Sequence, residues 1–237
     1  IVDTFVYAWG DFRPLDRWIE IMEQRLAEMP EFPSPAIAAR VASGMFMALM
    51  YRQPQHPQMA AWAERVKRVV IEAPDPRTQM ILGNQLLLYY TAWIGDFTSA
   101  RILLEAVPPP AGTSDTEPLV YIAWRTMQAG YHWFMAEHEA CLRAVRDGLA
   151  TAERTGAHPL SALLVSQGVI GSLTAGELDR AGELLRGAAA TLARARPLDR
   201  AHYHYLAFLD ALFRGDAASA FTHAHEAVAL APRRLPR

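Results

Sequence analysis

The sequence predicts an all-α fold, a right-handed α-solenoid of about five to six antiparallel helix pairs with a period near 41 residues. Two interleaved sets of residues predict this fold: prolines at expected helix starts, and residues at expected turns. Prolines recur at intervals of 41, 42, 41 and 38 residues, at Pro35, Pro76, Pro118, Pro159 and Pro197. A turn follows each proline after 17 to 19 residues, at Pro54, Gly95, Ala136, Gly176 and Gly215. Residues 1–237 are therefore expected to form a single helical-repeat domain.

The first helix of each pair is expected to begin at its proline. Proline is tolerated in the first turn because the N–H groups there have no intrahelical acceptor. Ser34, Asp75 and Thr116 stand one or two residues before their prolines as ready N-caps. The mostly apolar segments that follow predict helices over residues 36–51, 77–93, 119–134, 160–173 and 198–213.

The second helix of each pair is expected to be amphipathic. Gly or a substitute ends the first helix, and Asp or Glu follows where the helix dipole favours a negative charge. The turn at 52–57 is irregular, so its second helix should begin near Pro57 or Gln58. Five residues after the turns stand small residues that would let the two helices cross closely: Ala100, Cys141, Ala181 and Ala220. Cys141 is thus expected to be a packing residue rather than a reactive thiol.

Composition excludes several classes of protein. The net charge of −2 gives no excess of positive charge for direct nucleic-acid binding. No apolar run reaches the roughly 18 residues that span a membrane. A single cysteine rules out an internal disulfide and a thiolate cluster, which suits the cytoplasm. Because Ile1 opens what looks like the middle of a helix, the chain is expected to be a fragment of a longer multidomain protein.

Motifs that would carry catalysis are missing from the sequence. It contains no Walker-type loop, no His-Glu-x-x-His and no Gly-x-Ser-x-Gly elbow. We therefore expect no enzyme, no cofactor and no catalytic residue. Four histidines in the last pair, His202, His204, His223 and His225, could supply one metal ligand from each helix. Such a site would still need Asp210 or Glu226, and packing is the favoured explanation.

Aromatic residues recur near the end of the first helices. Trp9, Trp93 and Trp133 precede their turns by one to three residues and match Tyr51 and Phe213. Because they repeat at one architectural position, packing between successive pairs is favoured over a binding cage.

Polar residues inside the apolar first helices form the candidate binding surface. Counting back eleven residues from each turn gives Ser43, Asn84, Arg125, Val165 and His204, and counting back four gives Met50, Thr91, His132, Ser172 and Ala211. Two helical turns separate the rows, so they share a face, which lines the concave wall of a solenoid. The candidate ligand-binding residues are Asn84, Gln85, Tyr89, Thr91, Arg125, Gln128, Tyr131, His132, Gln167 and His204. Arg125 needs an acid or anion partner. The alternative is that the concave wall is solvated and binds no ligand, with Arg125 paired to a neighbouring carboxylate.

The segment Gly95-Asp96-Phe97, followed by Ala100, resembles the turn of tetratricopeptide-like repeats. Units near 41 residues, with Leu88, Val169 and Phe208 in place of that family's small residue, are more similar to the helical-repeat sensor region of large bacterial transcription regulators related to the maltose-regulon activator. In that family a signalling ATPase module precedes the repeats, and the output module lies elsewhere in the chain.

The resemblance implies a ligand- or protein-sensing module of a bacterial signalling ATPase or transcription regulator, acting in signal transduction through a concave groove. Its partners would be adjoining domains of the same chain and a protein, peptide or small ligand in the groove. The alternative is a constitutive protein–protein interaction scaffold with no small-molecule ligand, whose groove holds a peptide or whose ends self-associate.

Overall fold

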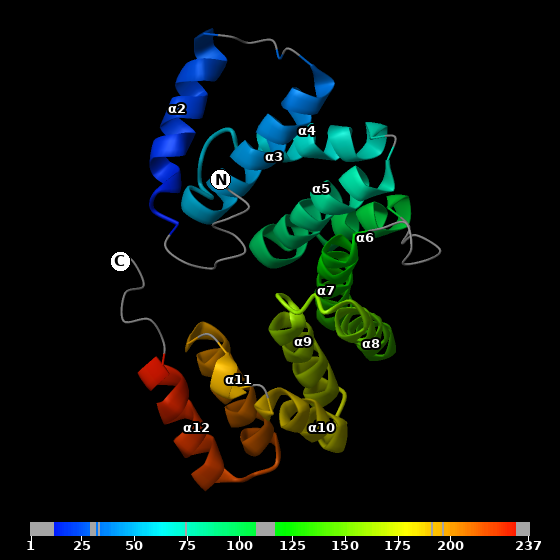
Figure 1. The fold of residues 1–237 in the computed structure, drawn as a ribbon, viewed down its shortest axis with the longest axis vertical. Helices are drawn as coiled ribbons and strands as arrows, with labels where there is room; N and C mark the ends of the chain where they lie inside the picture. Colours follow the sequence, from blue (N-terminus) through cyan, green and yellow to red (C-terminus); the bar gives the residue numbers. More distant parts are fainter. Residues whose placement is uncertain are drawn as a thin grey trace. The chain divides into compact units, whose positions relative to one another are not determined.

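A computed structural model describes residues 12–28, 32, 34–73, 75–107, 117–190, 192–195 and 197–230. Within these ranges the protein is all-α and contains no strand, which confirms the predicted class (Figure 1). The chain forms two compact units, residues 1–120 and 121–237, and each is described by itself. The single domain expected from the repeats stays a prediction.

Unit 1 is a set of helices that pack on their neighbours in the chain. Its helices are α2 (Leu15–Glu28), α3 (Pro35–Arg52), α4 (Met59–Glu72), α5 (Pro76–Leu88), a π-helical turn (Tyr89–Ile94) and α6 (Phe97–Ala106). α3 contacts α2, α4 and α5, while α5 contacts α4 and α6. The first helix α3 therefore also contacts α5, the first helix of the next pair.

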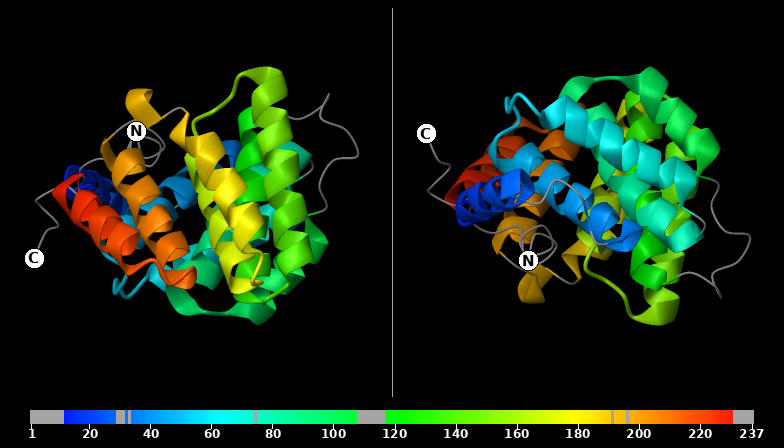
Figure 2. Two further views of the ribbon diagram at one scale, coloured as in Figure 1. Left: turned by 90° about the horizontal axis from the view of Figure 1, so that it is seen from below. Right: turned by 90° about the horizontal axis from the view of Figure 1, so that it is seen from above.

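Unit 2 repeats this pattern of contacts. Its helices are α7 (Pro118–Phe134, in this unit from Tyr121), α8 (His138–Thr155), α9 (Ser161–Thr174), α10 (Leu178–Ala189), a 3₁₀ turn (Leu192–Arg194), α11 (Pro197–Phe213) and α12 (Ala217–Leu230). α9 contacts α8, α10 and α11, and α11 contacts α10 and α12. Both views of Figure 2 show α11 and α12 side by side.

The helix starts and turns follow the expected local chemistry. The Ser34 hydroxyl and the Asp75 carboxylate accept hydrogen bonds from the backbone N–H groups of Ile37 and Thr78, at 3.3 and 2.8 Å. Thr116 lies outside the described residues. Gly95, Gly176 and Gly215 are left-handed, and so is Ala136, with φ of 56°. Ala136 is thus the substitute for glycine at its turn.

Two helices depart from the expected boundaries. α9 begins at Ser161 and not at Pro159, because α8 runs to Thr155 and residues 156–160 are needed for the connection. The helix expected over 77–93 ends as an α-helix at Leu88 and continues as a π-helical turn. In that turn the Thr91 hydroxyl donates to the Leu87 carbonyl at 2.7 Å.

Small and aromatic residues pack as expected at the positions described. Ala100, Cys141, Ala181 and Ala220 are all buried, because the two helices of each pair cross there. In unit 1 the Tyr51 ring stacks on Phe12 at 4.9 Å and meets Trp93 edge-on at 6.1 Å. This ring contact between successive helix pairs confirms the packing interpretation for Tyr51 and Trp93. Trp9 lies outside the described residues.

Candidate functional site

The four candidate residues of unit 1 are turned largely inward. Gln85 and Thr91 are buried, and the Gln85 amide oxygen accepts a 3.0 Å hydrogen bond from the Ser43 hydroxyl. Tyr89 packs edge-on against Phe46 at 5.3 Å, and burial raises the pKa of its hydroxyl. The buried Asn84 side-chain oxygen has no hydrogen-bond partner within the described part of the chain.

Arg125, the charged candidate binding residue of unit 2, contacts polar residues of its own unit. Its guanidinium donates to the Tyr121 hydroxyl at 2.9 Å and to the Gln128 amide oxygen at 3.0 Å, and it lies 3.1 Å from an Asp147 carboxylate oxygen. Asp147 belongs to α8, so this ion pair ties α7 to α8. The acid that the sequence demanded for Arg125 is therefore available inside the protein, which is the alternative stated above.

The remaining candidates of unit 2 on α7 and α9 are Gln128, Tyr131, His132 and Gln167. Gln128 and Tyr131 are buried, and His132 lies 2.6 Å from the Glu137 carboxylate. The buried Gln167 side-chain oxygen has no partner within the described ranges. None of the ten candidates is fully exposed. Their role in binding a ligand stays a prediction.

His204 and His223 meet across the α11–α12 pair. Their Nδ1 atoms lie 3.0 Å apart, so one ring donates and the other accepts. Burial, and then the neighbouring His223, lower the pKa of His204. No group of three or more His, Cys, Asp or Glu side chains in the described part of the chain is placed to hold a metal ion. That two histidines from these helices meet agrees with the sequence, whereas a third ligand does not join them.

Cys141 has the surroundings of a packing residue. It is fully buried in a cluster with Ala129, Ala144 and Val145. Burial raises the pKa of its thiol to about 11, so the nucleophilic thiolate is scarce near neutral pH.

Unit 1 contains a groove that the sequence did not predict as a binding site. Its volume is about 1210 Å³, and α2, α3, the end of α4 and α5 line it. Its apolar walls include Trp18, Ile37, Val41 and Ile81. Gly44 contributes open space, because a Cβ atom at that position would meet no described atom within 4 Å. Trp18 and Ile37 are 41% and 43% exposed, so large apolar surface faces the hollow.

Charged groups stand at the edge of this groove. Arg77 pairs with Glu117 at 2.8 Å, and the Asp75 carboxylate caps α5, whose N–H group at Thr78 lowers the Asp75 pKa. Arg40 and Glu72 are exposed and line the groove, and no ion-pair partner for either occurs among the described residues. Of the two, the cation of Arg40 suits a ligand that has an apolar body and an acid group.

One sequence signal could have directed attention to the groove. Gly44 interrupts the interior of α3, where glycine costs about 0.5–1 kcal/mol relative to alanine. A glycine at such a position needs a close neighbour or an open space to explain it. The choice between these two depends on contacts distant in the sequence.

Comparisons of this chain with family models, curated proteins and solved structures find no match. In the described ranges, no helix combines the length and apolar character required to cross a bilayer.

Proposed function

We propose that this chain is a ligand-sensing helical-repeat module, in which the groove of unit 1 binds an apolar ligand that carries an acid group. The groove carries the proposal: about 1210 Å³ of hollow combines exposed Trp18 and Ile37 with the cation of Arg40. Ligand sites are typically concave and mostly apolar, with a few placed polar groups that orient the ligand.

The architecture proposed with it is a right-handed α-solenoid of antiparallel helix pairs with a period near 41 residues. Helices that begin at Pro35, Pro76, Pro118 and Pro197 support this repeat. Contacts of α3 with α5 and of α9 with α11 support the stacking of successive pairs within each unit. Stacked pairs are the framework on which such proteins build extended binding surfaces.

The resemblance to sensor regions of bacterial regulators defines the cellular role that we propose. Ligand binding would change how this module packs against an adjoining ATPase or output domain. Such a signal requires that the ligand bind the packed and released arrangements with different free energy. A Walker-type ATPase motif encoded next to this segment supports the role, and the absence of any signalling module from the full-length protein contradicts it.

The binding site can be tested with anilinonaphthalene sulfonate, a fluorescent probe with apolar rings and an acid group. Gly44→Leu should fill the groove and Arg40→Ala should remove the cation, so each should weaken the affinity of the groove site by about tenfold. Arg68→Ala is the matched control, because Arg68 is an exposed arginine of the same unit and does not line the groove. Probe affinity unchanged in both groove variants would refute the proposed site.

A further inference from the structure

A second cation borders the groove of unit 1 and is already paired with an acid. Arg77, in the first turn of α5, lines the groove together with Thr78 and Ile81. Its Nε and Nη2 atoms both donate to one oxygen of the Glu117 carboxylate, at 3.1 and 2.8 Å. Arg77 is therefore held at the edge of the groove by an acid group, which is the group that the proposed ligand carries.

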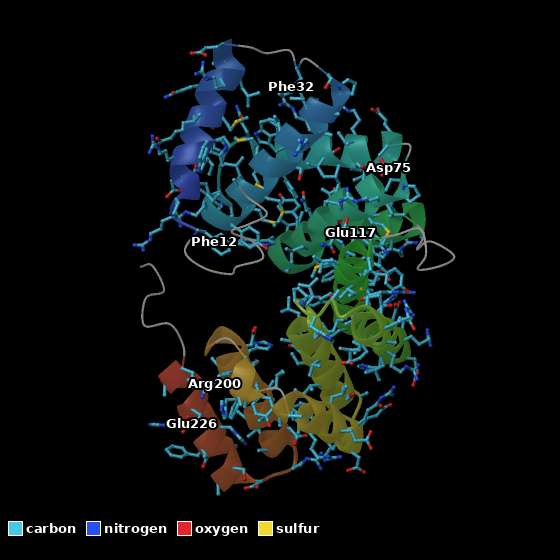
Figure 3. All side chains as sticks on the ribbon, in the orientation of Figure 1. Phe12, Phe32, Asp75, Glu117, Arg200 and Glu226 are labelled. Atoms are coloured by element: carbon cyan, nitrogen blue, oxygen red, sulfur yellow. The ribbon has the colours of Figure 1, made fainter. Side chains whose placement is uncertain are left out.

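The ion pair of Arg77 with Glu117 is exposed and joins distant segments of unit 1. Its side chains are 58% and 50% exposed. Glu117 directly precedes Pro118, the first residue of α7, and Figure 3 labels it together with Asp75 at the start of α5. Exposed ion pairs contribute little to stability, because water and salt screen them and both long side chains lose conformational freedom. A competing acid can therefore take Arg77 from Glu117.

Arg77 and Arg40 can serve the same acid group. α4 returns antiparallel between α3 and α5, so these two helices run in the same direction, and the Ser43–Gln85 hydrogen bond places Arg40 level with Leu82. Leu82 lies five residues after Arg77, which is roughly 7.5 Å along the helix. Side chains of a helix tilt toward its first residues, so Arg40 leans toward the level of Arg77.

We propose that Glu117 is an internal competitor of the ligand: it holds Arg77 in the empty protein, and the acid group of the ligand displaces it and binds Arg77 and Arg40. The competition rests on the function proposed above and regulates that same groove. Because the carboxylates of Glu72 and Asp75 also line the groove, an acid group there depends on its arginines. Binding then releases Glu117 from α5, so occupancy of the groove is coupled to the contact that precedes α7.

The affinity of the 237-residue chain for anilinonaphthalene sulfonate tests this competition. Glu117→Gln should raise that affinity about two- to fivefold, because a neutral amide competes poorly for Arg77. Glu105→Gln is the matched control, since Glu105 is an exposed acid of the same unit that pairs with Arg101 at 3.1 Å and does not line the groove. That variant should bind the probe as the wild type does.

An uncharged probe identifies the acid group as the competing part. N-phenyl-1-naphthylamine has the same rings as anilinonaphthalene sulfonate and no acid group. It should bind Glu117→Gln and the wild type with equal affinity, because it does not compete for Arg77. A gain of the same size with both probes would overturn the proposal.

Replacing the shared cation separates competition from a general effect of charge. With Arg77→Gln already present, Glu117→Gln should no longer raise the affinity for anilinonaphthalene sulfonate. A gain that persists without Arg77, or no gain in Glu117→Gln alone, would overturn the proposal. If Gly44→Leu weakens probe binding while Glu117→Gln leaves it unchanged, the groove stands and only the competition fails. Probe affinity unchanged in Gly44→Leu and Arg40→Ala refutes the groove and the competition together.

Discussion

Two contacts between successive first helices can be compared, that of α3 with α5 in unit 1 and that of α9 with α11 in unit 2. Both involve a serine and a glycine, but the glycine borders open space in unit 1 and is packed in unit 2. Each has a serine hydrogen-bonded to the next first helix, Ser43 to Gln85 at 3.0 Å and Ser166 to His202 at 2.7 Å. Each has a helix-interior glycine close to that serine. Gly44 faces the groove, whereas Gly168 is packed against side chains.

This difference separates two reasons for placing glycine in a helix. At position 168 the absent Cβ permits close approach, because one built there lies 2.9 Å from Leu184 Cδ1 and 3.1 Å from Val145 Cγ1. At position 44 no described atom lies within 4 Å of an added Cβ, so the glycine borders open space and is not required by close packing. A helix-interior glycine can therefore border a groove in one unit and a packed wall in the other.

The largest expected effect comes from filling the packed position. Gly168→Leu should lower the free energy of unfolding by about 1–3 kcal/mol, because the added atoms overlap Leu184 and the stiff Val145. Urea unfolding measures it. Gly187→Leu is the control, since Gly187 also lies in a helix of unit 2 and has no atom near an added Cβ. Equal stabilities of the two variants would show that position 168 is not packed.

Removing a hydroxyl from the α3–α5 contact should have the next effect. Ser43→Ala leaves the buried Gln85 amide oxygen without its donor and should cost about 1 kcal/mol in the free energy of unfolding. Thr98→Ala, which removes an exposed hydroxyl of the same unit, should cost less. If Ser43→Ala unfolds at the wild-type urea concentration, the hydrogen bond does not stabilise this contact.

The open glycine should respond with the opposite sign. Gly44→Ala should raise the free energy of unfolding by about 0.5–1 kcal/mol, because alanine restricts the unfolded chain and its Cβ meets no neighbouring described atom within 4 Å. The same urea series measures it. A loss of stability would mean that position 44 is packed in solution and that the comparison with Gly168 fails.

The smallest expected effect is a pH dependence of stability that involves the Ser166–His202 hydrogen bond and not the Ser43–Gln85 hydrogen bond. Burial lowers the pKa of His202, and the Asp199 charge opposes this shift. The unfolded chain then binds more protons than the folded chain as the pH falls through 6.5, the ordinary value. Stability is therefore fully present above that pH and is lost on acidification toward the lowered pKa.

Thermal melting at neutral and mildly acidic pH measures this loss. His202→Gln keeps an amide that can donate to Ser166 but does not titrate, so its melting temperature should fall less than that of the wild type. Ser43→Ala should retain the wild-type pH dependence, because Ser43 and Gln85 carry no charge in this range. A pH profile of His202→Gln that coincides with the wild-type profile would contradict the assignment.

Sequence by itself determined the turns and the helix starts at Pro35, Pro76, Pro118 and Pro197. Proline, the caps at Ser34 and Asp75, and glycine at left-handed positions act over a few residues, so their effects can be read locally. The all-α class and the small residues at the crossings follow from the same local and periodic signals. The beginning of α9 at Ser161 and the π-helical turn after Leu88 were not predicted from these local signals.

Only the tertiary structure decided which polar residues of the first helices face one another and where space remains. Ser43 meets Gln85 across 42 residues of sequence, and Ser166 meets His202 across 36. Arg125 finds Asp147 on the next helix rather than an open groove. Gly44 and Gly168 both lie inside an apolar helix near a serine, yet one borders a hollow and the other a packed wall. Burial depends on distant side chains that share no local pattern, so the spacing along the chain leaves it undetermined.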